Sequence, residues 1–596
     1  MTNDGTAIRP VKRLLIANRG EIALRIMRTC REMGITTIAI YGPGEELAPH
    51  VRAADEAWRI DSANPLPYLD IDAVISLVHS SAADAVHPGY GFLAENARFA
   101  SEVVAAGAMF VGPSAKAIAA MGDKVEARRV AVEAGVEPSP GTQDPVDTIE
   151  AAHEAAARIG YPIAVKAAGG GGGRGFRVAR TAADLQEAFD GSSGEAARYF
   201  ANPAVYLERY LDHPRHIEVQ VFGDSLGNVV ALGERDCSVQ RRHQKLIEES
   251  PSVAVDPDLR ERLNDASVAL ARAVDYVGAG TIEYLLTPTG EFFFLEMNTR
   301  IQVEHTVTEM VTGIDLVREQ IRVAEGHPLS FDRHSVDPRG WSIECRVNAE
   351  DAGRDFAPTP GLISSYVEPT GFGVRVDAAC GAGDEVFPAY DSLISKVVTW
   401  GRDRDEARHR MLRALRDYQI EGVPTTIPFL VNVLESDAFA SGAFSTSFIG
   451  DYPELLPPPA AIIAKSGESP VEPTSLVIEV NGKRFDTRVF GTVGPQADID
   501  GRSTQPPRRG KRRERAAAAT ATGNDVVSPV QGTIVRVSAA EGEQVQVGQV
   551  ICVIEAMKME NDVVAHKAGT VVGLAIEPGQ AVATGLVLAS IVEVAD

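Results

Sequence analysis

An internal repeat near the C-terminus constrains the fold of this chain more than any other feature. Residues 532–554 and 569–591 repeat with a period of 37, with glycine and branched aliphatic residues in step. The matched pairs include Gly532 and Gly569, Gly542 and Gly579, Val550 and Val587, and Ile554 and Ile591. Two similar β-rich halves with glycine at equivalent turns predict a small all-β sandwich with internal two-fold symmetry.

A lysine stands between two strand-like runs of this module. Lys558 lies in Glu555-Ala-Met-Lys558-Met-Glu560, after the apolar run 550–554 and before the run 562–564. The pattern predicts a hairpin that presents one amine to solvent at its tip. A lone lysine of this kind is usually an ordinary surface residue, but its place in a symmetric module makes it a candidate attachment point.

The length of 596 residues predicts roughly four units of about 150 residues each. The net charge of −24 argues against nucleic acid as the main partner. Five scattered cysteines, the lack of an export signal and the lack of an 18-residue apolar run predict a cytoplasmic protein with free thiols and no membrane partner.

The N-terminal part predicts a βαβ unit within residues 13–41, with a strand at 14–17 and a second at 36–41. The turn between strand and helix lacks the GxGxxG pattern, so a dinucleotide site is not favoured. Further on, a glycine tract at 169–175 lies between predicted strands at 163–166 and 176–179. Such a tract can be a plain linker, but between two strands it favours a mobile hairpin whose backbone approaches phosphate.

Residues 350–450 predict a mixed α/β unit with an amphipathic helix near 405–417. A hairpin through Asn481-Gly482 is predicted next, and its role stays open. Residues 495–523 read as a linker whose segment 501–515 holds seven Lys/Arg against one acid. Nucleic-acid binding is one interpretation of that charge, but in so acidic a chain we favour a tether that self-repulsion keeps extended.

The central block concentrates polar chemistry on predicted strands at 281–284 and 293–298, with their acids pointing outward. Glu283, Glu296 and Asn298 offer the hard oxygen ligands that Mg²⁺ prefers, although three polar residues on a sheet face are the simpler alternative. The segment Arg300-Ile-Gln-Val-Glu-His305 predicts an anion pocket that contains a carboxylate. The basic run 237–245 is either a solvated face or a charge that neutralises phosphate.

Seven short motifs along the chain are Ala17-Asn-Arg-Gly-Glu-Ile22, His87-Pro-Gly-Tyr-Gly91, Met121-Gly-Asp-Lys124, Glu234-Arg-Asp-Cys-Ser238, Glu296-Met-Asn-Thr-Arg300, Ile343-Glu-Cys-Arg346 and Ala556-Met-Lys-Met559. Through the first six, residues 11–450 resemble the biotin carboxylase component of acyl-CoA carboxylases, an ATP-grasp enzyme. Through the last, residues 524–594 resemble the biotinyl carrier domain of biotin-dependent carboxylases.

The resemblance implies a multidomain α/β fold of the ATP-grasp biotin carboxylase type plus a small carrier sandwich. The implied parts are a Rossmann-like N-terminal domain (11–121), an ATP-grasp domain (122–330) with its glycine-rich lid around 135–205, a mixed α/β C-terminal domain (331–455), a linker with a hairpin and a basic tether (456–523), and an all-β biotinyl carrier domain (524–596).

The resemblance also implies the site residues. ATP would be bound by Lys124, Lys166, Gly171, Gly172, Glu208, Leu211, His216, Gln240 and His243, and Mg²⁺ (or Mn²⁺) by Glu283, Glu296 and Asn298. Bicarbonate would be bound by Lys245, Arg300, Gln302 and Val303. Glu304 would be the base that deprotonates bicarbonate, Arg346 would stabilise the biotin enolate, and Lys558 would carry biotin. Thr306 departs from the proline of most relatives, and we do not expect it to abolish activity.

The implied function is ATP- and bicarbonate-dependent carboxylation of biotin on the chain's own carrier. No carboxyltransferase segment follows the carrier, so a separate β subunit is expected to transfer the carboxyl group to acetyl-CoA or propionyl-CoA. Biotin protein ligase is a further expected partner, and we expect a homo-oligomer within a hetero-oligomeric complex. The alternatives are the α chain of a methylcrotonoyl-CoA carboxylase or of a two-subunit pyruvate carboxylase, and, more remotely, a non-catalytic biotin carrier or scaffold.

Overall fold

The computed structural model describes residues 8–460, strands 474–480 and 483–489, and residues 524–592. Within these ranges it leaves out residues 143, 168–175, 201–203, 243, 335, 529–531, 557–558, 575, 579 and 583–585. The chain divides into two compact units, Met1–Val386 with Ser392–Ala460, and Phe387–Asp391 with Ala461–Asp596.

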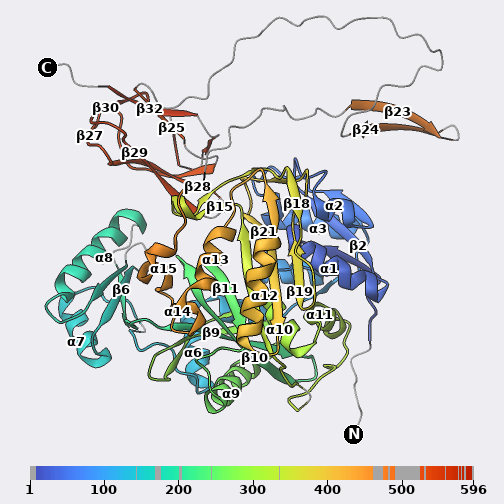
Figure 1. Ribbon diagram of the computed structural model, residues 1–596, viewed down its shortest axis with the longest axis horizontal. Helices are drawn as coiled ribbons and strands as arrows, with labels where there is room; N and C mark the ends of the chain where they lie inside the picture. The colour runs from blue at the N-terminus through green and yellow to red at the C-terminus, as the bar shows by residue number, and fades with distance from the viewer. Residues whose placement is uncertain are drawn as a thin grey trace, which may run out of the picture. The chain divides into compact units, whose positions relative to one another are not determined.

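The first unit begins with a parallel sheet in the order β3-β2-β1-β4-β5, coloured blue in Figure 1. Its strands are β1 (Arg13–Ile16), β2 (Thr36–Tyr41), β3 (Glu56–Arg59), β4 (Ala85–His87) and β5 (Met109–Phe110). The intervening helices are α1 (Gly20–Met33), α2 (Pro49–Ala53), α3 (Ile71–Ser80) and α4 (Ala97–Ala105). Leu14 and Ile16 are fully buried, as expected for a central parallel strand. The predicted βαβ unit is confirmed, and Gly20 makes the turn into α1 at φ 64°.

A small three-stranded sheet in the order β7-β6-β8 has its own hydrophobic core, built on residues such as Ala156, Ile163 and Leu207. The elements of this region are α5 (Ala115–Gly122), α6 (Lys124–Glu133), α7 (Ile149–Ile159), β6 (Ile163–Ala167), β7 (Phe176–Ala179), α8 (Leu185–Phe200) and β8 (Val205–Arg209). Strands β6 and β7 pair antiparallel, which confirms the strands predicted around the glycine tract. The tract itself lies outside the described residues.

An antiparallel sheet of eight strands forms the centre of the first unit, in the order β13-β12-β9-β10-β11-β14-β21-β19. Its strands are β9 (Arg215–Gly223), β10 (Val229–Arg241), β11 (Gln244–Ser250), β12 (Gly278–Leu286), β13 (Phe292–Asn298), β14 (Trp341–Asn348), β19 (Val374–Ala378) and β21 (Leu393–Gly401). Because β11 pairs with β14, strands from both sides of residue 330 belong to one sheet and can place side chains on one face.

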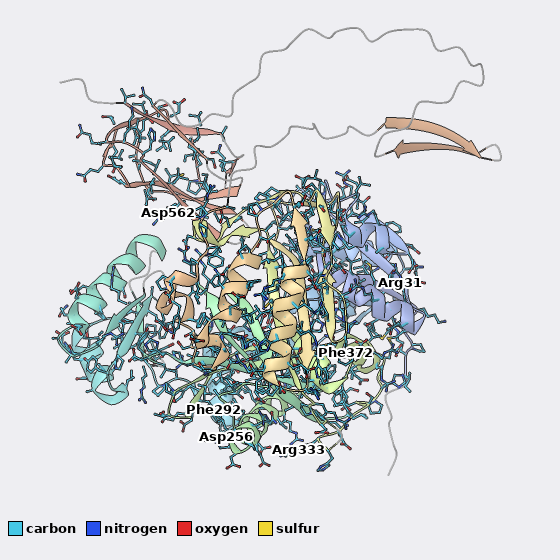
Figure 2. All side chains as sticks on the ribbon, viewed as in Figure 1. Arg31, Asp256, Phe292, Arg333, Phe372 and Asp562 are labelled. Atoms are coloured by element: carbon cyan, nitrogen blue, oxygen red, sulfur yellow. The ribbon has the colours of Figure 1, made fainter. Side chains whose placement is uncertain are left out.

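Helices cover this sheet (Figure 1). One of them, α12, packs against β21 and corresponds to the amphipathic helix predicted near 405–417. The helices are α9 (Pro257–Ala273), α10 (His305–Thr312), α11 (Leu316–Ala324), α12 (Arg404–Asp417), α13 (Ile427–Glu435), α14 (Asp437–Ala440) and α15 (Phe448–Asp451). Asp256, labelled in Figure 2, caps α9 by accepting a hydrogen bond from the Leu259 amide. None of the described helices is long and apolar enough to cross a membrane.

Short strands complete the C-terminal part of this unit. They are β15 (Glu350–Asp351), β16 (Ala357–Pro358), β17 (Gly361–Leu362), β18 (Ser365–Val367), β20 (Glu385–Val386) and β22 (Gln419–Glu421).

The second unit contains the predicted hairpin, as β23 (Thr474–Val480) paired with β24 (Lys483–Val489), and a sandwich of two four-stranded sheets. The sandwich strands are β25 (Asp525–Val527), β26 (Gly532–Val537), β27 (Gln544–Val545), β28 (Val550–Ala556), β29 (Met559–Val564), β30 (Gly569–Val572), β31 (Ala581–Val582) and β32 (Val587–Val592). The sheet orders are β25-β32-β30-β27 and β29-β28-β26-β31. A shift of 37 residues converts one order into the other, and the pairing of Ile534 with Ile554 recurs as that of Val571 with Ile591. The predicted two-fold symmetry is therefore confirmed.

Candidate active site

A buried lysine is the centre of the site. Lys245, on β11, places its Nζ 2.5 Å from Glu218, 2.9 Å from Glu283 and 2.6 Å from Glu304. Glu218 and Glu283 come from β9 and β12, whereas Glu304 immediately precedes α10. Burial alone would lower the pKa of Lys245, but the three carboxylates hold it well above its usual range. Lys245 is therefore a fixed positive charge.

Glu304 has a second cation, Arg346 of β14, whose guanidinium lies 2.9 Å from its Oε2. Arg346 also donates to Glu248 at 2.6 Å. Burial opposes ionisation of Glu304, but Lys245 and then Arg346 outweigh it and hold the pKa of this carboxyl well below its usual range. Burial raises the pKa of Glu248 to about 7, although Arg346 acts against the shift. The predicted base is thus an ionised carboxylate between two cations.

Arg235, on β10, lies beneath this centre and is fully buried. Its guanidinium donates to Glu218 at 2.5 Å and to Gln302 Oε1 at 2.7 Å. The Gln302 amide in turn donates to Glu283 at 2.9 Å. Arg235 therefore holds the predicted bicarbonate residue Gln302 in the same network as Lys245.

Arg300 and Val303, the other predicted bicarbonate residues, have partners of their own. Arg300 lies 2.8 Å from Glu95 and donates to the Asn298 side-chain oxygen at 2.7 Å. The main-chain carbonyl of Val303 accepts a hydrogen bond from Lys396 at 2.8 Å. Arg300 thus borders Asn298, a predicted metal ligand, and its hydrogen bonds and ion pairs within the described residues are to Glu95, Asn298 and the Ile301 carbonyl rather than to a shared partner of Lys245.

The three predicted metal ligands lie together. Glu283 and Glu296 are cross-strand neighbours on β12 and β13, and Asn298 donates to Glu283 at 2.9 Å. The expectation of outward acids is wrong for Glu283, which is 5% exposed because β12 lies inside the sheet and Lys245 and His216 cover its carboxylate. It holds for Glu296, whose exposed carboxylate has no hydrogen bond or ion pair among the described residues.

This arrangement fits a hard cation. Although Glu296 reaches solvent, partial desolvation by the surrounding protein and then the charge of Glu283 raise its pKa, so a divalent ion between the two carboxylates would relieve their repulsion. His216 lies 3.1 Å from Glu283, and that carboxylate raises the pKa of the imidazole even though burial acts to lower it.

The predicted nucleotide residues that the structure describes lie on helix α6 and on strands β6, β8, β9 and β10, or just after β8. Lys166 on β6 and Glu208 on β8 form an ion pair at 2.5 Å, and Arg128 lies 2.9 Å from the same carboxylate. Leu211 follows β8 and is half-buried, and Lys124 is exposed at the start of α6. Lys166 and Glu208, both predicted to bind ATP, are thus in direct contact.

His216 and Gln240 lie closer to the centre. Both are buried, and Gln240 pairs across the β10–β11 hairpin with Lys245.

A cavity of about 500 Å³ opens where β9 begins. It is lined by residues including His213, Arg215, Leu286, Phe444, Ser445 and Tyr452. Gly171, Gly172 and His243 lie outside the described residues.

Two further residues singled out in the sequence are Thr306 and Lys558. Thr306, in the first turn of α10, is buried and donates its hydroxyl to Glu344 of β14. Lys558 lies outside the described residues, but β28 and β29 on either side of it pair in antiparallel register, with Ala556 opposite Met559. That register agrees with the hairpin predicted around Lys558.

Sequence reasoning gave no role to several residues that the structure places in the centre. For Glu218 the available signal was the alternation of polar residues along the otherwise apolar β9, because residues two apart on a strand share a face. For Arg235 it was its place inside the Glu234–Ser238 motif. Glu95 and Glu248 had no comparable signal, since each meets its partner from a distant element. The residues missed are Glu95, Glu218, Arg235 and Glu248.

The fold and site together define a class: an ATP-grasp ligase with a parallel N-terminal sheet, an antiparallel central sheet and a separate all-β carrier module. Four family models match along the chain. They are "Biotin carboxylase, N-terminal domain" (10–118), "Carbamoyl-phosphate synthase L chain, ATP binding domain" (123–331), "Biotin carboxylase C-terminal domain" (344–451) and "Biotin-requiring enzyme" (524–591).

Relatives of known identity agree with this class. Biotin carboxylase 1 of Bacillus subtilis is 51% identical over 444 residues, which are 74% of this chain and 99% of that protein. A pyruvate carboxylase subunit of Methanothermobacter thermautotrophicus is 47% identical over 461 residues, 77% of this chain and 94% of the relative. The crystal structure of the biotin carboxylase domain dimer of Hydrogenobacter thermophilus 2-oxoglutarate carboxylase, with MgADP, ADP and bicarbonate, superposes with a TM-score of 0.71 at 45% identity, covering 75% of this chain and 99% of that one. The chain belongs to the biotin carboxylase family and carries a biotin-requiring carrier domain in the same polypeptide.

Proposed function

We propose that this chain is the α chain of an acyl-CoA carboxylase. It carboxylates biotin on its own carrier domain, and a separate carboxyltransferase β subunit passes the carboxyl group to acetyl-CoA or propionyl-CoA, giving malonyl- or methylmalonyl-CoA. The observation that carries the proposal is that one chain contains both the Lys245–Glu304–Arg346 centre and a biotin-requiring module. A carboxyltransferase on a separate chain is supported by relatives that are themselves named as subunits, including the small subunit of 2-oxoglutarate carboxylase.

In this proposal Glu304 removes the proton of bicarbonate, with Lys245, Arg300, Gln302 and Val303 as the binding residues. Its carboxylate is ionised, as a base must be, but two ion pairs make it a weak one. Bicarbonate is an anion and competes for the same cations. Its binding would therefore withdraw positive charge from Glu304 and raise the proton affinity of the carboxylate at the moment when the base is needed.

Mg²⁺ or Mn²⁺ would be held by Glu283, Glu296 and Asn298, and would supply positive charge for the phosphoryl group in transfer. ATP would be bound through Lys124, Lys166, Glu208, Leu211, His216 and Gln240, together with Gly171, Gly172 and His243. The free Glu296 carboxylate beside Glu283 supports the metal assignment. The related 2-oxoglutarate carboxylase domain holds MgADP and bicarbonate, which supports both ligand sets.

Lys558 would be the residue to which biotin protein ligase attaches biotin, and the hairpin register around it supports that role. Arg346 would provide positive charge for biotin as it accepts the carboxyl group, since its guanidinium already lies beside Glu304.

A homo-oligomer is part of the proposal. Phe372, labelled in Figure 2, is 77% exposed and packs edge-on against Trp400 with Arg410 over its ring. So exposed an aromatic residue beside arginine is typical of a protein interface. The related Hydrogenobacter domain is a dimer.

Identity to a pyruvate carboxylase subunit favours a second candidate, the α chain of a two-subunit pyruvate carboxylase. The test is to purify the chain with its native carboxyltransferase and to measure ATP-dependent fixation of labelled bicarbonate onto acetyl-CoA, propionyl-CoA, methylcrotonoyl-CoA and pyruvate. Label on acetyl-CoA or propionyl-CoA is the expected result. Label on pyruvate or methylcrotonoyl-CoA alone would replace the proposal by the corresponding alternative.

A further inference from the structure

A second buried lysine lies next to the catalytic centre, and neither the motifs nor the proposed reaction assigns it a role. Lys396, on β21, is fully buried. It is the cross-strand neighbour of Arg346 on β14, so both side chains lie on one face of the sheet. A buried ammonium group is costly, and it persists only where partners compensate its charge.

Lys396 has two partners from distant parts of the chain. Its Nζ lies 3.1 Å from Glu21 Oε1 of helix α1 and donates to the main-chain carbonyl of Val303 at 2.8 Å. Glu21 is also buried, and the Tyr90 hydroxyl donates to it. The ammonium therefore joins helix α1 to the turn that ends at Glu304.

The hydrogen bond from Lys396 to Val303 matters because Val303 directly precedes Glu304, the proposed base. The turn from Gln302 to His305 carries the proposed base, and two of its carbonyl groups are held by side chains. The His305 ring binds the Gln302 carbonyl at 2.7 Å, and Lys396 binds the next one. Burial and then the charge of Lys396 keep the pKa of His305 well below its usual range, so the ring is neutral and donates to that carbonyl.

We propose that Lys396 is a positioning residue for carboxylation: it fixes the backbone of Val303, and through it the directions of Gln302 and Glu304, against helix α1 by way of Glu21. The inference rests on the proposed role of Glu304 as the base. Without Lys396, Glu304 would keep Lys245 and Arg346 as partners, but the Val303 carbonyl beside it would lose its side-chain donor. A shift of about 1 Å in a reacting group can cost roughly 100-fold in rate.

The test uses the full-length chain and free biotin, with bicarbonate-dependent ATP hydrolysis as the readout. We expect Lys396→Met to lower kcat about 10- to 100-fold and to raise KM for bicarbonate, while KM for ATP stays within about twofold. Lys396→Arg should restore part of kcat, because its guanidinium can still donate to the Val303 carbonyl. Arg260→Met is the matched control, since it breaks an ion pair to the buried Glu234 at 2.7 Å on another element of the same unit.

Glu21→Gln is a second variant that keeps Lys396 and removes only its counter-charge. It should show a smaller effect of the same kind. The loss of kcat in the double variant should be less than the product of the two single losses, because both substitutions disrupt the same Lys396–Glu21 contact. A Lys396→Met enzyme with the kcat and bicarbonate KM of the Arg260→Met control overturns the inference. If Lys396→Met does not fold, Glu21→Gln with wild-type constants overturns it. A wild-type chain without bicarbonate-dependent hydrolysis would instead refute the proposed function itself.

Discussion

Replacing Glu304 by glutamine removes a negative charge and a proton acceptor while keeping nearly the same volume. A positioned general base contributes about 10²–10⁴-fold to rate, which is roughly 3–5 kcal/mol of activation free energy. Glu304 is 2% exposed and contacts both Lys245 and Arg346, whereas Glu218 contacts the first of these cations and Glu248 the second. We therefore expect Glu304→Gln to lower bicarbonate- and biotin-dependent ATP hydrolysis by that factor.

The effect on stability should be much smaller than the effect on rate. Breaking a buried pair costs about 3–5 kcal/mol when it leaves a charge without a partner. Here Lys245 keeps Glu218 at 2.5 Å, and Arg346 keeps Glu248 at 2.6 Å. The glutamine oxygen can still accept one hydrogen bond, so the free energy of unfolding should fall by less than that range.

The assay follows ATP hydrolysis at saturating ATP and Mg²⁺ over a range of bicarbonate concentrations, with the thermal unfolding midpoint measured in parallel. Glu234→Gln is the matched control, because Glu234 is a buried carboxylate paired with Arg260 outside the centre. Wild-type turnover in Glu304→Gln would remove Glu304 from the role of base. An equal loss of turnover in both variants would attribute the effect to stability.

Other consequences can be checked independently. Lys558→Ala should abolish the streptavidin signal of the purified chain, and a persistent signal would place biotin elsewhere. Deleting the basic segment 501–520 should slow carboxyl transfer to the partner while sparing carboxylation of free biotin, because a shorter tether limits where the carrier can reach; unchanged coupled rates would contradict this. The folded-state pKa of Glu304 is depressed, so its stabilising contribution is present above the unfolded pKa of about 4.3 and is lost as pH falls through the lower folded value. Acid unfolding of the wild type below about pH 4.3 should therefore be steeper than that of Glu304→Gln, and identical acid transitions would refute the assignment.

Local patterns in the sequence were enough to determine many of the elements. The period of 37 specified matching strands and, through them, two sheets of equivalent order, because a repeated pattern of turns and apolar residues forms the same local structure twice. The apolar run of β1 with the turn at Gly20, and the apolar strands on either side of the glycine tract, were predicted for similar reasons. The family resemblance also predicted Lys245, Glu304 and Arg346 as site residues.

Only the tertiary structure determines which charged residues contact one another. Lys245 and Glu304 are 59 residues apart, Arg346 is 42 residues beyond Glu304, and Lys396 reaches Val303 across 93. Periodicity specifies which face of a strand a residue occupies, but not which strand becomes its neighbour. That choice depends on burial of apolar surface summed over the whole unit. The sequence alone thus predicted two of the central strands, at 281–284 and 293–298, and some of the site residues, whereas the order of strands in one long sheet placed Glu218, Arg235, Glu248 and Lys396 around them.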